Sequence, residues 1–461
     1  MKFGTIVSDD TTISYPFSSF EEFKYFKTTL TTGSNGTFYG CSVLESLEFP
    51  HGVTTIGQYV LYGCNSLNWV TFPSTLTTIA PYNFNSNSNY VSNLHNINFR
   101  GTFQQWLNVN IQNVGWPPGI AGIHFYLNDV EMTSFNFPSN LTTIKQATCY
   151  GMKYVIGDLI IPDTVTTIGD SAFFNCSGLT NVISSDASIG QNTFRGSGNG
   201  TGVLHVKGTV TSTQGTISHF KKVIFNKNAL VNGSASFLTY NGAAEIVRIG
   251  NNWDIARNTF GLGYEKPLNL RFFEVGNEVL TNGYAIVGGG WSTSGTPTII
   301  THFSKSTIPF AKATTNRFAN FFANVSNIYI GTGESQSGDQ TVLDTYLQDT
   351  DWATYQSKMD LWYNYNGIYR TYTVTNSLTN VNNTNVVGYP YITRNESYET
   401  TLVEDEGYTL SSVQVLMYEA VDDGSTPANP TDITNSVYDS DTHKILIPQV
   451  KGNITIIAMA S

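Results

Sequence analysis

Charged side chains are scarce in this sequence. Asp, Glu, Lys and Arg together make up 12% of the 461 residues, whereas about 25% is typical of soluble domains. Apolar residues, at 40%, still suffice for a packed core, so the polar surface must come largely from Thr, Asn, Ser, Gly and Tyr. This composition is typical of β-structure outside the metabolic cytoplasm. The formal net charge of −11 disfavours nucleic acid as a partner, because a negative surface repels phosphate backbones.

Long apolar runs are also missing. The sequence contains no apolar stretch of about 18 residues, so we expect no membrane-spanning helix. Residues 1–7 are followed at once by the polar residues 8–10, which leaves no apolar core of the length of a secretory signal. We therefore expect either an exported chain that has been processed or release by another route, such as inside a virus particle.

Few residues are suited to ligate metals or form disulfides. The four cysteines include no Cys-x-x-Cys pair, and the seven histidines show no pair at metal-ligand spacing. Cys41 and Cys64 are 23 residues apart and both follow Tyr-Gly. Cys176 stands at the same offset from its repeat isoleucine as Cys64. This regularity predicts buried thiols stacked in a ladder, with a disulfide or a metal site as the alternative, and we expect no cofactor.

No combination of residues indicates a catalytic site. The glycine-rich segment 288–293 lacks the Gly-Lys-Ser/Thr ending of a phosphate-binding loop. The acidic groups at 404–406, 422–423 and 439–441 fall in predicted turns, and nothing in the sequence places two carboxylates on one wall of a cleft. We therefore predict that the protein is not an enzyme.

The sequence does contain a phrase that occurs four times, Phe/Ile-Pro-x-x-Val/Leu-Thr-Thr-Ile. Its first two copies are 23 residues apart and its last two are 24 residues apart. Constant spacing of this kind indicates stacked units, each of which buries its apolar edge against the next copy. The residues that we expect to hold the repeat in register are Pro50, Ile56, Cys64, Pro73, Ile79, Pro138, Ile144, Pro162, Ile168 and Cys176.

Each repeat should contain two short strands, one before its proline and one after it. The preceding Leu-x-x-Leu/Val-x-Phe, as in 44–49 and 67–72, predicts a strand with an inward apolar face. Proline cannot donate a ladder hydrogen bond, so it ends this strand. The following Val/Leu-Thr-Thr-Ile starts a second strand, in which stacked threonine hydroxyls can bond along the ladder.

This pattern resembles the BspA-type leucine-rich repeat, whose phrase is close to Leu-x-x-Ile-x-Ile-Pro-x-x-Val-x-x-Ile-Gly-x-x-Ala-Phe-x-x-Cys. The agreement is closest at 161–176, and Gly-Thr-Phe-Gln-Gln-Trp at 101–106 is similar to an insert common in that family. The resemblance covers residues 36–110 and 133–182. It implies a leucine-rich-repeat solenoid of the kind found on phage particles and on bacterial surfaces.

The remaining sequence divides the chain further. Strand-and-turn alternation continues at 203–206, 222–225, 244–249, 270–275, 297–301 and 327–330. We predict a mainly β protein: an N-terminal cap or attachment segment at 1–35 (with a short helix at 18–27), the solenoid at 36–340, a helical cap and linker at 341–367, and a small antiparallel β-sandwich at 368–461. The expected sandwich strands are 369–378, 398–403, 413–418, 444–447 and 453–459. Segments 406–413 and 448–456 resemble Ig-like modules appended to phage tail and bacterial surface proteins.

One aromatic cluster is a candidate binding site. Trp362, Tyr363, Tyr365, Tyr369 and Tyr372 fall at the predicted junction between solenoid and sandwich. Exposed aromatic rings stack on sugar faces and provide contact area at modest entropic cost, so the cluster is a candidate for glycan or receptor contact. Packing of the junction itself is the alternative.

Taken with the resemblance, these features favour a non-enzymatic protein of a tailed bacteriophage virion: a head fibre, a tail fibre or a decoration subunit. Its expected partners are capsid or tail subunits, other copies of itself within the assembly, and a glycan or protein of the host surface. The alternative is a BspA-like adhesin on a bacterial cell surface that binds host proteins or glycans. A glycan-degrading enzyme on a β-scaffold is a third class.

Overall fold

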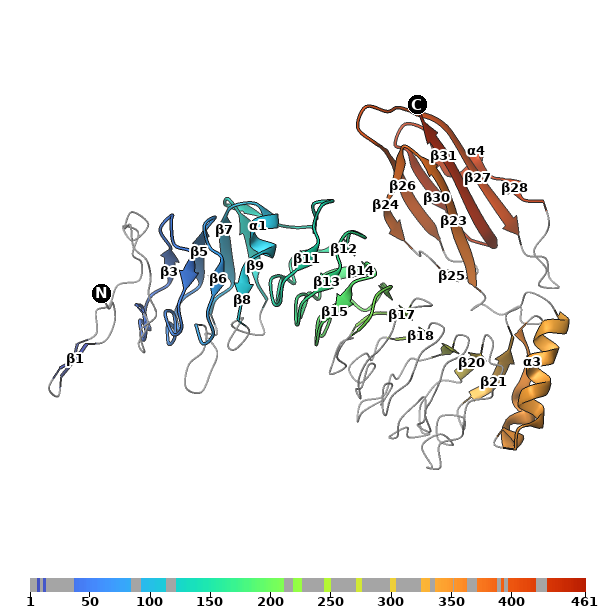
Figure 1. The fold of residues 1–461 in the computed structure, drawn as a ribbon, viewed down its shortest axis with the longest axis horizontal. Coiled ribbons are helices and arrows are strands. Elements are labelled where there is room, and N and C mark those ends of the chain that lie inside the picture. The colour runs from blue at the N-terminus through green and yellow to red at the C-terminus, as the bar shows by residue number, and fades with distance from the viewer. Residues whose placement is uncertain are drawn as a thin grey trace.

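Stacked parallel strands follow one another along the described part of the chain and are followed by a two-sheet sandwich (Figure 1). This confirms the predicted fold class, a mainly β leucine-rich-repeat solenoid with a C-terminal β-sandwich. The computed structural model describes residues 6–8, 11–13, 37–83, 93–112, 122–210, 219–225, 244–249, 271–275, 299–303, 325–331, 336–350, 352–362, 371–387, 391–393, 397–419 and 429–461.

The first block of the solenoid has two sheets on different sides of the coil. The larger one is parallel apart from its last, antiparallel strand, and contains β3 (Ser46–Glu48), β5 (Trp69–Pro73), β7 (Asn96–Arg100), β9 (His124–Leu127) and β10 (Val130–Glu131). The smaller one is parallel and contains β4 (Thr55–Ile56), β6 (Thr78–Ile79) and β8 (Asn110–Ile111).

Each proline of the repeat phrase begins the tight turn that joins the two strands of its coil. The carbonyl of Pro50 accepts a hydrogen bond from the amide of Val53 at 3.2 Å. The same bond, from the residue three positions later, closes the turns that begin at Pro73, Pro138 and Pro162, with lengths of 3.0, 3.1 and 2.9 Å. A turn of constant length keeps the second strand of every coil in the same place relative to the first.

The isoleucines that end the repeat phrase lie opposite one another in successive coils. Ile56 pairs with Ile79, and Ile79 pairs with Ile111. All three are at most 1% exposed. Ile144 and Ile168 are aligned in the same way in the next block, and the threonine before each isoleucine is also in register with its neighbour. The inner column of isoleucines therefore sets the register of the stack.

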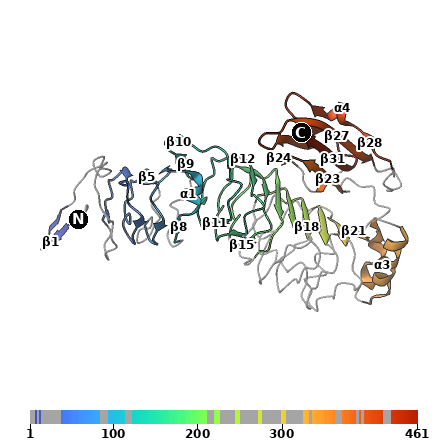
Figure 2. The ribbon, with the colours of Figure 1, turned by 45° about the horizontal axis from the view of Figure 1, so that its top comes forward.

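The second block repeats this arrangement with a longer sheet. Its small sheet contains β11 (Thr143–Ile144), β13 (Thr167–Ile168) and β15 (Ser188–Ile189). Its large sheet has nine parallel strands: β12 (Gly157–Ile160), β14 (Leu179–Ile183), β16 (Val203–Val206), β17 (Lys222–Phe225), β18 (Ile246–Ile249), β19 (Phe272–Val275), β20 (Ile299–Phe303), β21 (Val325–Ile330) and β22 (Met359–Leu361). Figure 2 shows these strands following one another toward helix α3 (Gln336–Gln348).

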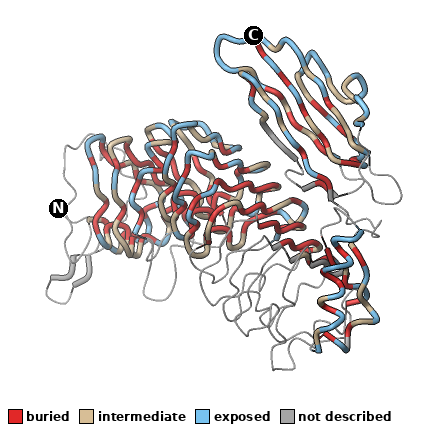
Figure 3. Tube along the Cα trace, turned by 45° about the vertical axis from the view of Figure 1, so that its right-hand side comes forward, coloured by how far each residue is buried: buried red, intermediate tan, exposed pale blue. Residues whose placement is uncertain are grey.

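The two blocks share one core although their large sheets are separate. A single cluster of buried apolar side chains extends from Phe38 to Leu361, and its buried positions run along the inside of the coil (Figure 3). Helix α1 (Phe103–Leu107) lies at the boundary, where its Trp106 is 0% exposed and donates from Nε1 to the carbonyl of Thr148 in the next block at 2.6 Å. The insert at 101–106 thus joins the blocks.

At the C-terminal end of the solenoid, helix α3 (Gln336–Gln348) and the 3₁₀ helix η2 (Ala353–Lys358) cover the core. Tyr346 and Trp352 are 0% exposed and belong to the solenoid core, with ring centroids 5.2 Å apart. The structure differs from the predicted cap and linker at 341–367 in one respect. Strand β22 follows η2 and pairs with β21, so the chain makes one more turn of the coil after the helix.

The sandwich packs two sheets around a core of its own. One sheet contains β23 (Thr371–Thr379), β25 (Tyr391–Thr393), β27 (Leu410–Glu419), β28 (Thr431–Asp432) and β31 (Gly452–Ala460). The other contains β24 (Val381–Val387), β26 (Tyr398–Glu404), β29 (Tyr438–Asp439) and β30 (Lys444–Ile447), and the short helix α4 (Thr434–Val437) precedes β29. The strands of the sandwich pair antiparallel except at one place, where its first and last strands, β23 and β31, run side by side in the same direction.

At the N-terminus the structure describes one short antiparallel hairpin, β1 (Ile6–Ser8) with β2 (Thr11–Ile13). The helix predicted at 18–27 lies outside the described residues.

The four cysteines are buried thiols in the stack, and none is in a disulfide. Sγ of Cys64 donates to the carbonyl of Phe38 at 3.1 Å, and Sγ of Cys176 donates to the carbonyl of Cys149 at 3.0 Å. Burial raises the pKa of the Cys149 and Cys176 thiols. A hydrogen bond with Cys41, together with burial, raises the pKa of Cys64.

The isoleucine column is testable by truncation. Ile79→Ala should lower the free energy of unfolding by about 2–5 kcal/mol, because it leaves a cavity between two stacked coils. Thr77→Ala, one residue before the same strand, is the control: it removes an exposed hydroxyl that donates to the carbonyl of Thr54, and should cost less than about 1 kcal/mol. Urea denaturation followed by circular dichroism measures both, and equal losses would contradict the buried column.

The thiols are testable by chemical modification. At pH 9, Cys64, Cys149 and Cys176 should stay unmodified in the folded chain and react fully in denaturant, as mapped by mass spectrometry. Unfolded thiols ionise near a pKa of roughly 8.5, whereas these folded thiols remain protonated, so the unfolding free energy should fall as the pH rises above that value. Modification of Cys176 at equal rates in the folded and unfolded chain would contradict this.

Candidate functional site

Polar and aromatic side chains gather on the solvent side of the first large sheet. Side chains alternate along a strand, so Val70, Ile97 and Phe125 point into the core while their neighbours point outward. We call the outward side the sheet face, and define it by Glu48, Trp69, Thr71, Asn96, Asn98, Arg100, His124, Tyr126, Asp129 and Glu131. Because the strands are in register, Glu48, Thr71, Asn98 and Tyr126 form one row across four strands.

The hairpin of β9 and β10 brings a carboxylate to this face. Its two-residue turn, Asn128 and Asp129, has φ values of 50° and 69°, the left-handed backbone that such hairpin turns require and that Asn and Asp tolerate. The side chain of Asn98 holds the turn in place from below. Its Nδ2 donates to Asp129 Oδ1 at 2.8 Å, and its Oδ1 accepts from the Asp129 amide at 3.1 Å. Asn98 is 0% exposed, so its amide is rigidly positioned.

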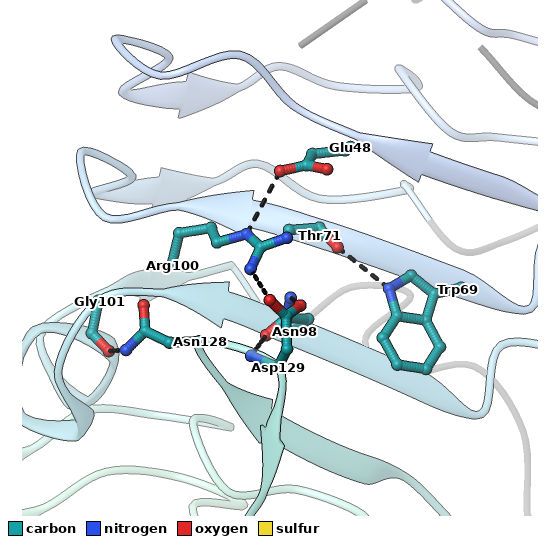
Figure 4. Close-up of polar contacts among 8 residues, drawn as sticks. All are labelled: Glu48, Trp69, Thr71, Asn98, Arg100, Gly101, Asn128 and Asp129. Carbon is teal, nitrogen blue, oxygen red and sulfur yellow. Dashed lines mark hydrogen bonds and ion pairs between the residues drawn. The ribbon is translucent and has the colours of Figure 1, made fainter. Parts of the chain in front are cut away.

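Arg100 lies between two carboxylates, as Figure 4 shows. Its Nε donates to Glu48 Oε1 at 3.3 Å, and its Nη1 donates to Asp129 Oδ2. Partial burial alone would lower the pKa of Arg100, but the hydrogen bond to Asp129 and the two negative charges raise it. The three side chains link strand β3, strand β7 and the hairpin turn across the face.

Trp69 and Tyr126 form a strip of two adjacent rings on the same face. Their centroids are 4.8 Å apart with the planes at 38°, although the residues come from strands separated by β7. The indole Nε1 donates to Thr71 Oγ1 at 3.0 Å, and the Tyr126 hydroxyl reaches Asn96 Oδ1 at 3.4 Å. Both rings are partly buried. Burial, together with the charge of Glu131, raises the pKa of Tyr126.

The far end of the face continues toward the second block. His124 forms an ion pair with Glu131 when its ring is protonated, and the same ring stacks on Tyr154 with centroids 3.7 Å apart. Tyr154 is 39% exposed.

The chemistry available here is that of a binding surface. It offers fixed donors, fixed acceptors and ring faces on one open side of a sheet. Within the described residues, no group of three or more His, Cys, Asp or Glu side chains could hold a metal ion. No helix in that part of the chain is long and apolar enough to cross a membrane.

Of the aromatic cluster predicted from the sequence, the structure describes Trp362 and Tyr372. Tyr372 is 4% exposed and lies in the sandwich core, where its ring packs against other apolar side chains. Trp362 packs on the solenoid, with its ring centroid 6.1 Å from Phe272 and 5.8 Å from Tyr329. These contacts match the alternative of junction packing. Tyr363, Tyr365 and Tyr369 lie outside the described residues.

The sheet face was not predicted, although the repeat phrase contains a signal for it. The variable positions that flank the inward residues of Leu-x-x-Leu-x-Phe are outward positions by strand alternation. They hold Trp69 and Thr71 in one repeat and Asn96 and Asn98 in the next. Only the register shows that Tyr126 and Asp129 join them.

Comparison with known proteins supports the repeat assignment. The model of the BspA type leucine rich repeat region matches six copies over residues 13–114 and 120–219. No curated protein matches the chain. Similar solved structures include a leucine rich cell surface protein from Faecalibacterium prausnitzii (14% identity, TM-score 0.29, covering 74% of this chain and 88% of that one). A leucine-rich repeat protein from Bacteroides ovatus is also similar (15% identity, TM-score 0.29, covering 71% of this chain and 85% of that one). So is the leucine rich repeat protein of T. pallidum (18% identity, TM-score 0.17, covering 33% of this chain and 76% of that one).

The anchoring of the hairpin turn is testable through Asn98. Asn98→Ala should lower the free energy of unfolding by about 1–3 kcal/mol, because it removes two hydrogen bonds to Asp129 and leaves buried space beside β7. Asn96→Ala on the same strand, whose side chain bonds Asn68 at an exposed site, should cost less than about 1 kcal/mol. Urea denaturation measures the free energy of unfolding of both variants. A larger loss for Asn96→Ala than for Asn98→Ala would show that Asn98 does not hold the turn.

Proposed function

We propose that this protein is a non-enzymatic adhesive protein, exposed on a bacterial cell surface or on a bacteriophage particle, that binds its target through the sheet face. The observation that carries the proposal is the Trp69–Tyr126 strip beside the Glu48–Arg100–Asp129 cluster. Binding surfaces are enriched in Trp, Tyr and Arg. Here these residues are fixed on a rigid sheet, so little conformational entropy is lost when a target binds.

The arrangement of the carboxylates favours binding over catalysis. A glycosidase needs two carboxyl groups on either side of the scissile bond, one as acid and one as base or nucleophile. Glu48 and Asp129 both bind Arg100, and Glu131, which lies opposite Tyr126 in the hairpin, contacts His124. The first two position the guanidinium, and none of the three forms a pair of carboxylates on either side of a cleft.

The BspA-type match over residues 13–114 and 120–219 supports a surface-exposed repeat protein. The virion location, the capsid or tail subunits as partners, and the relation of the sandwich to Ig-like modules stay predictions from the sequence. The low charge content of 12% suits both a particle surface and a cell surface.

The function is testable with the full-length chain. Fluorescently labelled protein should bind saturably to intact cells of its host or target, and the double variant Trp69→Ala/Tyr126→Ala should lose at least ten-fold in affinity. Trp362→Ala is the matched control, because that ring packs on the solenoid outside the sheet face. Surface polysaccharide recovered after incubation should keep its chain length in size-exclusion chromatography.

Depolymerised polysaccharide would contradict the non-enzymatic proposal, and undiminished binding by the double variant would contradict the role of the sheet face. A mass-spectrometric inventory of purified phage particles, set beside one of the bacterial surface fraction, assigns the location. Absence of the chain from both would contradict the proposed exposure.

A further inference from the structure

The sheet face has the chemical features of a site for one class of ligand. We propose that the Trp69–Tyr126 strip is a subsite for a neutral carbohydrate, in which a sugar ring lies on the strip and its hydroxyl groups bond to the polar groups beside it. This inference rests on the proposed function and names the ligand of the same surface.

The first argument is the apolar surface. The ring centroids are 4.8 Å apart with the planes at 38°, so the two rings lean on one another between strands β5 and β9, and each keeps a partly exposed surface. The hydrogen bond from Trp69 Nε1 to Thr71 fixes the indole. Fixed aromatic rings provide contact area at low entropic cost. The C–H face of a pyranose ring is also apolar, so it can pack against such a ring.

The second argument is the hydrogen-bonding border. Arg100 uses Nε and Nη1 for Glu48 and Asp129, and its guanidinium carries five N–H donors, more than these two bonds need. Asp129 accepts one bond at each carboxylate oxygen and can accept a second at each. These planar groups offer neighbouring donors and acceptors, the pattern that adjacent hydroxyl groups of a sugar can satisfy.

The third argument is charge. The sheet face carries three carboxylates, Glu48, Asp129 and Glu131, and the single guanidinium of Arg100, so the face is formally negative when His124 is neutral. Charges of like sign placed together are repelled. A polyanionic glycan is therefore disfavoured, and a neutral one fits both the charge and the rings. A basic peptide would match the negative charge of the face, but it would not match the neighbouring donors and acceptors of Arg100 and Asp129.

The test is isothermal titration of the full-length protein with hexasaccharides of β-1,4-glucose, β-1,4-N-acetylglucosamine and α-1,4-glucose, with hexagalacturonate as the acidic probe and hexalysine as the basic one. At least one neutral probe should bind, and Trp69→Ala and Tyr126→Ala should each weaken it at least ten-fold. Tyr126→Phe should keep most of the affinity, because the ring remains. Hexagalacturonate should bind at least ten-fold more weakly at low salt.

Tyr62→Ala is the control. Tyr62 belongs to another stacked aromatic pair, with Tyr39 at 5.1 Å, away from the sheet face. Its substitution should leave sugar binding unchanged, and circular dichroism should show that every variant is folded. Stronger binding of hexagalacturonate or hexalysine, or a neutral sugar that binds equally to Trp69→Ala, would overturn the carbohydrate proposal.

The two proposals fail in different ways. If labelled protein still adheres to cells through Trp69 but none of the neutral probes binds or competes, the carbohydrate assignment fails and the adhesive function stands. If adhesion does not depend on Trp69, both fail.

Discussion

The burial of one isoleucine per coil against the isoleucine of the next coil is the interaction on which the rest of the solenoid depends. Ile56, Ile79 and Ile111 lie in register and are all at most 1% exposed. Burying a branched aliphatic side chain stabilises by about 1.5–3 kcal/mol, whereas a one-residue slip would turn the inward residues of a strand outward. Proline turns of constant length then carry this register from the small sheet to the large one.

That register also creates the sheet face. Parallel strands aligned residue for residue place outward positions from different repeats in rows, so that Glu48, Asn98 and Tyr126 fall in one row although they are far apart in sequence. Variation at outward positions changes the surface without disturbing the core. A repeat scaffold can therefore hold a specific set of aromatic and polar groups at little cost in stability. The binding role proposed for this face follows from that separation of core from surface.

The sequence predicts the elements better than their long-range partners. The strands expected at 203–206 and 222–225 have those bounds in β16 and β17, and five of the sandwich strands were also predicted. Strand β22 was missed because Met359 continues a helical apolar spacing, and the β23–β31 pairing joins segments about 80 residues apart. The sheet face was missed for the same reason: Asp129 reaches Asn98 and Arg100 through a hairpin turn that local patterns do not reveal. Conversely, Tyr372 and Trp362 are close in sequence but separate in the fold, because Tyr372 lies in the sandwich core and Trp362 packs against Phe272 and Tyr329 of the solenoid.

The most direct test of the in-register stack is a disulfide cross-link between equivalent positions of adjacent coils. Thr54 and Thr77 are both exposed, and the amide of Thr77 bonds the carbonyl of Thr54 at 2.8 Å; neighbouring strands are about 4.8 Å apart, within disulfide range. The pair Thr54→Cys/Thr77→Cys should oxidise rapidly within one folded chain, and the shifted pair His51→Cys/Thr77→Cys should not. Equal rates for the two pairs, or no cross-link at 54 and 77, would contradict the stacked register.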